Sequence, residues 1–166
     1  MAIRNVRELG DEVLRKRSKE VKAVTPRVLE LIDDMFDTMY ETMGVGLAAP
    51  QVGVLKRIVV IDVDDNPILM INPKILETRD SQTGSEGCLS VPGKAGMVTR
   101  PGYVRAEAYD ENLERFEIEG TELLARAICH ELDHLDGILY VDKVEGELFD
   151  TKAEDEEEEG AYEEEA

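Results

Sequence analysis

HELDHLDG, residues 130–137, contains both histidines of this 166-residue chain. On a helix, the four-residue step from His130 to His134 places both imidazoles on one face, with Cβ atoms about 5–6 Å apart. Two imidazoles at that spacing can bind one divalent metal ion, and Glu131 can lean over the open side of the ion as a general base. The motif also arises by chance. Here an apolar helical face precedes it and the chain has no other histidine, so we interpret the pair as metal ligands.

Length and composition indicate a single domain with its own core. The chain has two cysteines, too few for a disulfide framework, and no apolar run of transmembrane length or signal-peptide pattern, so we expect a cytoplasmic protein. Its net charge is −19, of which residues 150–166 carry −9 through ten acids and one lysine. An acidic chain without a basic stripe argues against binding to nucleic acid or to an anionic membrane. We expect the acidic tail, residues 150–166, to be disordered, beyond a catalytic domain of residues 1–149.

A site with two histidines needs at least one further protein ligand, and Cys88 is the candidate for it. A lone cysteine is usually a small buried apolar residue, but a thiolate is also a good ligand for a divalent ion. On the helix, Cys129 is turned about 100° away from His130, so we assign it to the core.

The segment GVGLAAPQVG, residues 44–53, is almost free of side-chain bulk, which predicts a loop that another backbone can approach. Its glycines match no nucleotide-binding fingerprint. Gln51 is its one polar side chain that can both donate and accept hydrogen bonds, and such a residue is more often structural than catalytic.

Apolar spacing predicts two helices and several antiparallel strands. Thr25 caps a helix from Pro26 to about residue 43, and we expect its methionines to face the core and not to form a binding surface. The metal-binding helix should cover about residues 121–136. The basic run at residues 15–17 reads as solvated surface. Strands are expected at residues 57–63, at 68–73 with Pro73 as the end, at 103–109, at 115–118 and at 138–141.

GVGLAAPQVG, EGCLS and HELDHLDG, in this order and in a chain of this length, resemble the motifs of the peptide deformylases. The resemblance extends from the start of the chain to about residue 149. It implies an α+β fold in which antiparallel β-sheets surround a central metal-binding helix, with a further helix on its N-terminal side. It also implies that Cys88, His130 and His134 bind one divalent metal ion. The implied native ion is Fe²⁺, although Zn²⁺, Ni²⁺ or Co²⁺ would also suit one thiolate and two imidazoles.

The reaction that the resemblance implies is hydrolysis of the N-formyl group from the N-terminal methionine of new bacterial polypeptides. Glu131 would be the acid/base, and the side-chain amide of Gln51 and the backbone N–H of Leu89 would donate to the formyl oxygen. The substrate backbone would pair with the Gly44–Gly46 segment as an added strand. The methionine side chain would lie in an apolar pocket. The residues expected to bind substrate are Val45, Gly46, Leu123 and Ala127. Members of the family often have an apolar residue at the position of Arg126, so the resemblance does not define the rim of this pocket.

Two other classes of metal protein share part of this pattern. A zinc protease with His130, Glu131 and His134 would take its third ligand downstream, where no histidine follows and Glu154 lies in the acidic tail. A metal-sensing module would have no use for Glu131. The expected partners are therefore formyl-methionyl nascent polypeptides. A transient ribosome contact would fit this role, but the acidic tail repels RNA, so we expect no electrostatic anchor.

Overall fold

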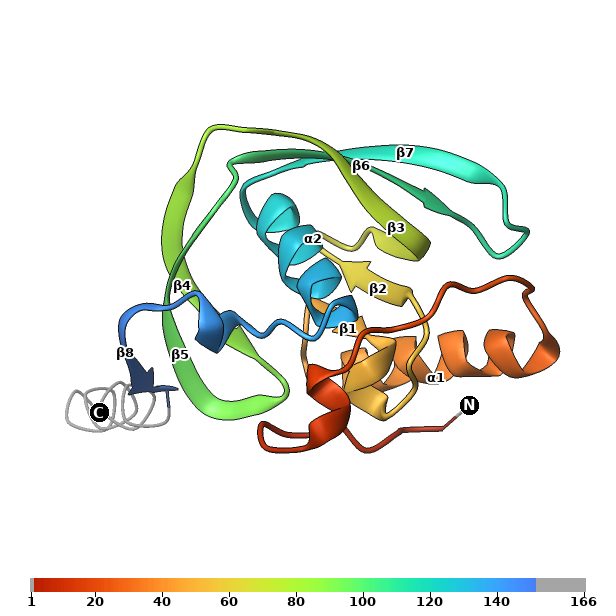
Figure 1. The fold of residues 1–166 in the computed structure, drawn as a ribbon, viewed down its shortest axis with the longest axis horizontal. Coiled ribbons are helices and arrows are strands. Elements are labelled where there is room, and N and C mark those ends of the chain that lie inside the picture. Colours follow the sequence, from red (N-terminus) through yellow and green to blue (C-terminus); the bar gives the residue numbers. More distant parts are fainter. Residues whose placement is uncertain (1, 152–166) are drawn as a thin grey trace, which may run out of the picture.

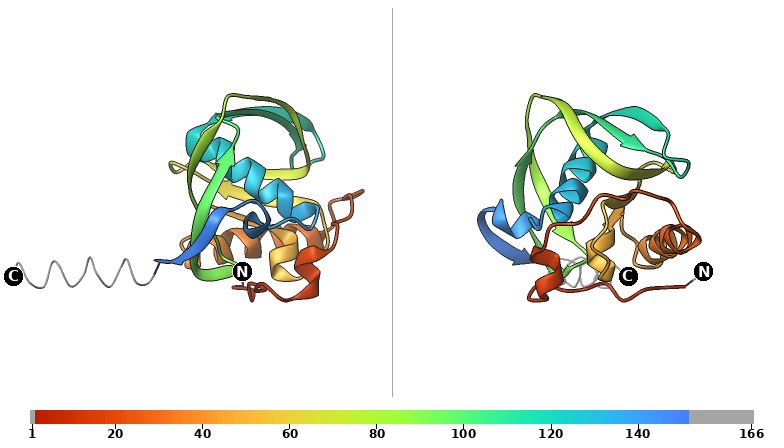
Figure 2. Two further views of the ribbon diagram at one scale, coloured as in Figure 1. Left: turned by 60° about the vertical axis from the view of Figure 1, so that its left-hand side comes forward. Right: turned by 45° about the vertical axis from the view of Figure 1, so that its right-hand side comes forward.

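The computed structural model describes residues 2–151, which form an α+β fold with antiparallel sheets (Figures 1 and 2). This confirms the predicted fold class. The helices are α1 (Pro26–Glu41) and α2 (Glu122–Leu135), and the short 3-10 turns are η1 (Glu12–Arg15), η2 (Ala49–Val52) and η3 (Tyr140–Asp142). The strands are β1 (Gly46–Ala48), β2 (Ile58–Asp62), β3 (Pro67–Arg79), β4 (Gln82–Cys88), β5 (Val91–Arg100), β6 (Tyr103–Tyr109), β7 (Arg115–Thr121) and β8 (Glu145–Asp150).

The strands form two sheets around α2. One sheet has five strands in the order β1-β2-β3-β6-β7, and the other has three in the order β4-β5-β8. Figure 1 shows α2 in the middle of the molecule, with β3, β6 and β7 above it and β4 and β5 to one side. The helix that carries both histidines is therefore the central helix, as expected.

β3 is longer than the sequence predicted, because Pro73 does not end it. Residues before Pro73 pair with β2, and Lys74 and those after it pair with β6. The register of pairing with β6 shifts between Ile71 and Lys74. Pro73 lies at this irregularity, where the strand needs no N–H donor and proline has none. At the same point Asn72 adopts a positive φ of 49°, and its side-chain amide bonds both the N–H and the C=O of Val21.

α2 is held by an apolar face of small and branched side chains. Ala125 and Ile128 are fully buried and pack with Ala106 and Ala108 of β6 in one core cluster. The alanines on both sides allow the helix to lie close to the sheet. Cys129 belongs to this cluster, and burial raises the pKa of its thiol to about 11, in agreement with its assignment to the core.

α1 begins where the sequence predicted, with the Thr25 hydroxyl accepting from the Val28 N–H at 3.3 Å. Met35 and Met39 are fully buried in a second core cluster, which confirms that this part of the methionine stripe faces the core. Met43 lies beyond the end of α1 and is 91% exposed.

The segment at residues 138–141 is not the strand that we predicted. It leads into η3, in which the Asp142 carboxylate accepts from the Leu139 N–H at 3.0 Å and binds Arg15 at 2.5 Å. Leu139 and Tyr140 are buried against Leu14, so the apolar pattern reflects a turn packed into a third core cluster. β8 follows and extends to Asp150, the first residue that we had assigned to the tail. Residues 152–166 lie outside the described part of the chain.

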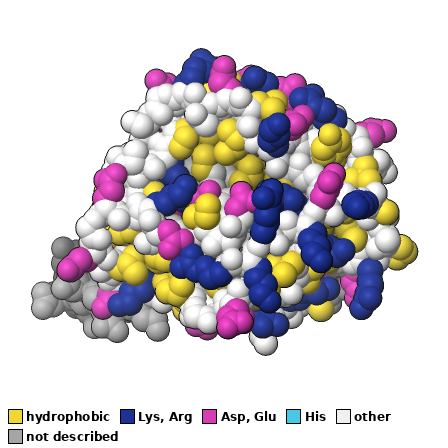
Figure 3. Space-filling model, viewed as in Figure 1, with side chains coloured by type: hydrophobic (Ala, Val, Ile, Leu, Met, Phe, Trp, Pro, Cys, Tyr) yellow, Lys and Arg dark blue, Asp and Glu magenta, His cyan; other side chains and the backbone are white. Residues whose placement is uncertain are grey.

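The basic run at residues 15–17 is exposed, as predicted. On the face of the molecule drawn in Figure 3, Lys and Arg side chains are spread out with Asp and Glu among them. Within residues 2–151, no helix combines the length and apolar character needed to cross a membrane.

Candidate metal centre

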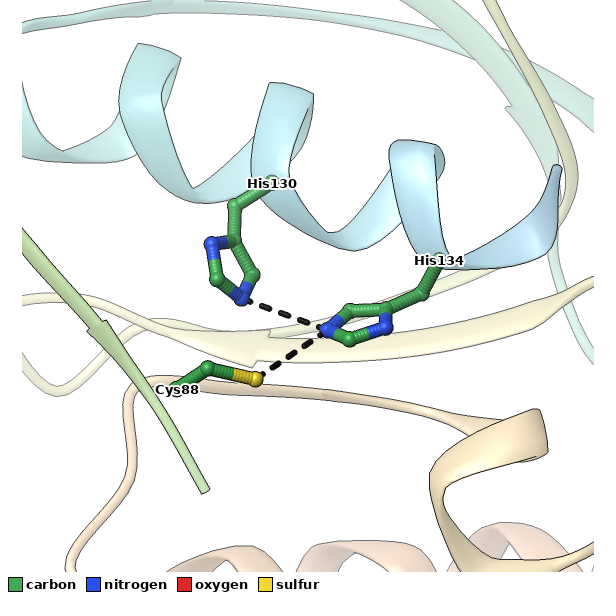
Figure 4. A group of neighbouring side chains, drawn as sticks. All are labelled: Cys88, His130 and His134. Carbon is green, nitrogen blue, oxygen red and sulfur yellow. Dashed lines mark hydrogen bonds between the residues drawn. The ribbon is translucent and has the colours of Figure 1, made fainter. Parts of the chain in front are cut away.

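Three potential ligands meet at the centre of the molecule (Figure 4). α2 places His130 and His134 one turn apart, with 3.3 Å between their Nε2 atoms. Cys88, the last residue of β4, brings its Sγ to 3.3 Å from Nε2 of His134. The three ligand atoms all lie within 4.8 Å of one another, so the structure brings together the three residues predicted as ligands.

The geometry and chemistry of these atoms fit one metal ion. Two nitrogens that each lie about 2.0–2.1 Å from a tetrahedral ion are about 3.3 Å apart, as the two Nε2 atoms are here. Burial, with the neighbouring charge of His130, lowers the pKa of His134 well below its ordinary value, so its ring is in the neutral form that binds metals.

Glu86 lies behind His130 and was not predicted from the sequence. Its Oε2 lies 2.7 Å from Nδ1 of His130, and Arg100 binds the same carboxylate through two nitrogens. Burial would raise the pKa of Glu86, but hydrogen bonds with His130 and Arg100 hold it well below its usual range. Because an ionised carboxylate only accepts, Nδ1 of His130 carries a hydrogen, and Nε2 is the nitrogen left to bind a metal, with release of its proton.

One sequence signal could have located Glu86. It stands two residues before Cys88, and alternate residues of a strand point to the same side. A strand ending at Cys88 would therefore have aimed both side chains at the metal-binding helix.

Glu131 lies beside the ligands with a free acceptor. It is 4% exposed, and its Oε1 is buried without a hydrogen-bond partner among the described residues. Burial raises the pKa of Glu131 to about 7, although the charge of His130 acts in the opposite direction. A carboxylate with that pKa can take up and release a proton near neutral pH.

The segment of small residues lies close to a side chain of the site. A Cβ at Gly46 would lie 2.5 Å from Oε2 of Glu131. The segment also contains β1, an edge strand, and then η2, which holds Gln51.

Gln51 is a buried and fully tethered residue. Its Oε1 accepts from the Ala48 N–H at 2.9 Å, and its Nε2 lies 3.1 Å from the Ser90 hydroxyl and 3.5 Å from Sγ of Cys88. The side-chain amide therefore faces the ligands.

A cavity of about 420 Å³ opens beside the ligands. Glu131, Gln51 and Leu89 line it together with the four residues predicted to bind substrate, Val45, Gly46, Leu123 and Ala127. Val45 and Leu123 remain 42% and 48% exposed at this cavity, while Ala127 is buried. Arg126 also lines the cavity, but its guanidinium binds Glu86.

The chain is similar to known proteins of one family. The sequence model described as polypeptide deformylase matches residues 3–148. A peptide deformylase of Agathobacter rectalis is 66% identical over 155 residues, which cover 93% of this chain and 98% of that protein. A peptide deformylase of Lachnoclostridium phytofermentans is 62% identical over 162 residues, or 96% of this chain and 99% of that protein.

Solved structures show the same likeness. The crystal structure of a peptide deformylase from Legionella pneumophila has a TM-score of 0.84 at 44% identity and covers 86% of each chain. That of a peptide deformylase from Synechococcus elongatus in complex with actinonin has a TM-score of 0.82 at 45% identity, with 85% of this chain and 78% of that chain covered. The chain therefore belongs to the polypeptide deformylase family, metal-dependent hydrolases that remove the N-formyl group from newly made polypeptides.

Proposed function

We propose that Cys88, His130 and His134 hold the metal ion of this deformylase, and that the native ion is Fe²⁺. The observation that carries the ligand assignment is the convergence of one sulfur and two Nε2 atoms within 4.8 Å, on side chains from β4 and α2. When bound, the ion supplies a water molecule activated for attack at neutral pH and polarises the formyl carbonyl.

Glu131 is the proton carrier of the reaction. Its free Oε1 accepts the proton released during attack on the formyl carbon, and the same carboxyl then donates a proton to the departing amine nitrogen. The burial of Glu131, which raises its pKa toward neutrality, supports this double role.

The side-chain amide of Gln51 and the backbone N–H of Leu89 donate to the formyl oxygen as negative charge develops there. Both residues line the cavity beside Cys88. Loss of one such donor typically lowers the rate by about 10²–10³-fold. Ala48 and Ser90 hold Gln51 in place, and its second N–H, which lies 3.5 Å from Sγ of Cys88 here, is the one that donates to the formyl oxygen.

The substrate binds with its methionine side chain in the cavity, against Val45, Leu123 and Ala127. β1 is the terminal strand of its sheet, which supports pairing of the substrate backbone with the outer edge of β1 at Gly46.

The decisive experiment measures formate release from a formyl-Met-Ala peptide, with the metal content determined on the same anaerobic preparation. We expect turnover proportional to bound metal, and the highest turnover with Fe²⁺. Turnover by metal-free protein would contradict the proposed site, and full activity only with another ion would contradict the choice of Fe²⁺. Actinonin, which is bound in the Synechococcus elongatus relative, should inhibit the reaction.

We further propose that the enzyme acts in the cytoplasm, where nascent chains emerge, and touches the ribosome at most transiently. The net charge of −19 supports the absence of an electrostatic anchor to RNA.

A further inference from the structure

Arg126 is a buried cation whose role the proposed reaction leaves open. It is 8% exposed, and its Nη1 lies 2.9 Å from Oε1 of Glu86 and 3.1 Å from the Val98 carbonyl oxygen. Its Nη2 lies 3.5 Å from the Gln82 carbonyl oxygen. Gly84 leaves room for this guanidinium, because a Cβ there would lie 3.3 Å from Nη2.

Arg126 is not needed to orient Glu86. Arg100 already holds both carboxylate oxygens, with Nε 3.1 Å from Oε1 and Nη2 2.6 Å from Oε2. Such a fork fixes the plane of the carboxylate and leaves Oε2 in place to accept from His130. The contribution of Arg126 is therefore mainly its charge.

The charges around Glu86 balance without Arg126. Glu86 and Asp133 are the two carboxylates of this network, and Arg100 and Lys143 are the two cations that bind them. Arg126 adds one positive charge, and its other two contacts are neutral carbonyl groups. The group of Glu86, Asp133, Arg100, Lys143 and Arg126 thus carries an excess of one positive charge.

We propose that Arg126 tunes the metal centre electrostatically by drawing electron density from Glu86. Glu86 then accepts less strongly from Nδ1–H of His130, and the ring becomes a poorer electron donor to the metal at Nε2. The excess charge also repels a divalent ion. Arg126 is thus a positioning residue that lowers metal affinity and leaves the ion more electrophilic. This inference rests on the proposed ligand set.

The test compares two neutral variants, Arg126→Met and Arg126→Gln, with Arg126→Lys, which keeps the charge. Gln is the second neutral variant in case Met impairs folding. Its amide can still donate a hydrogen bond to Glu86 or to the Val98 carbonyl. Arg79→Met is the control, since Arg79 is 60% exposed at the end of β3. The Zn²⁺ dissociation constant is measured by competition with a chelator. The second measurement is the imidazole ¹H–¹⁵N spectrum of the Zn²⁺-loaded full chain. This spectrum is simple because the chain contains only two histidines.

We expect the neutral variants to bind Zn²⁺ about tenfold more tightly, a change similar in size but opposite in sign to the loss that follows removal of a partner supporting a metal ligand. The Nδ1–H proton of His130 should move downfield as its hydrogen bond to Glu86 strengthens. The Lys variant and the Arg79→Met control should match the wild type. Unchanged or weaker binding in the neutral variants, or a Lys variant that behaves like Met, would overturn the inference. A wild type that binds no Zn²⁺ through its histidines would instead overturn the proposed ligand set.

Discussion

At the scale of single residues, the candidate metal centre consists of three ligand atoms, a buried carboxylate beside them and a second carboxylate behind His130. Residue types and spacing make Cys88, His130, His134 and Glu131 candidates, because a metal site needs particular donor atoms, and the family resemblance implies their roles. The spacing of Glu86 from Cys88 could have placed it near the site, but neither its role nor its cations could be predicted. Their role depends on which side chains the fold brings to Nδ1 of His130, and those partners come from different strands.

Replacing Glu131 with Gln separates proton transfer from metal binding. Gln keeps the shape of the side chain but cannot accept a proton, so turnover should fall by about 10²–10⁴-fold. Metal content should stay unchanged, because Glu131 is not among the three ligand residues. Parallel measurement of formate release and bound metal checks both points. A metal-sensing protein would lose little function in this variant.

The two cysteines should differ in their effect on metal binding. Cys88→Ser removes the thiolate ligand, and metal affinity should fall by more than the roughly 10–100-fold that follows loss of an outer partner. Cys129→Ser is the matched control, because Cys129 is buried in the core cluster on α2. It should alter thermal stability and not metal content. Equal metal loss in both variants would argue against Cys88 as a ligand.

At the scale of secondary structure, the long periodic segments were predictable and the irregular ones were not. α1 and α2 follow from apolar spacing and a capping residue, and β2 from its β-branched residues. β4 was missed because Gln82–Cys88 contains two glycines and no alternation of apolar side chains. Its partner β5 holds it in the sheet, so tertiary pairing decides its conformation.

The close approach of β1 to α2 can be tested at Gly46. In Gly46→Ala the new Cβ would lie 2.5 Å from Oε2 of Glu131, so the carboxylate must move. We expect turnover to fall by at least about tenfold, because a small displacement of a general base removes part of its 10²–10⁴-fold contribution.

Gly102→Ala is the control for that change. Gly102 lies between β5 and β6, where a Cβ would be 3.3 Å from Cβ of Asp80 and away from the site. Both variants should fold, as judged by circular dichroism. Full activity of Gly46→Ala would show that Glu131 tolerates displacement.

At the scale of the whole molecule, the sequence indicated the fold class but not how distant segments are joined. The family resemblance predicted sheets around a central helix, which the structure confirms. The segment before α1 gave no decisive pattern, because it is held by individual contacts. Ser18 donates its N–H to the Leu135 carbonyl, and Arg15 binds Asp142.

The Arg15–Asp142 pair should make the free energy of unfolding depend on pH in the acidic range. The hydrogen bond with Arg15 lowers the pKa of Asp142 below its ordinary value of 3.8. A carboxyl whose pKa is lower in the folded state stabilises the fold above its unfolded-state pKa. That contribution disappears as the pH falls through the folded-state value. Asp142→Asn should therefore be less stable than the wild type at neutral pH and nearly equal to it at pH values well below 3.8. Urea unfolding across this range measures the difference, with exposed Asp33→Asn on α1 as the control.

Removal of residues 152–166 should leave catalysis intact. Among residues 2–151, those that line the cavity all come before Asp150, which pairs with Lys94 of β5. We expect unchanged kcat/KM on small formyl peptides and lower solubility, because the deletion removes nine acids. A large loss of kcat/KM would assign the acidic tail a role in the reaction.

Cys88 and His134 are 46 residues apart in the chain, and the intervening segment contains β5, β6 and β7. A metal ion held by both residues would act as a reversible cross-link that closes this long loop and restricts the unfolded chain. Chelation should then lower the melting temperature as well as activity. Amide hydrogen exchange should accelerate first in the strands within the loop, so that loss of the ion is also an early step of unfolding.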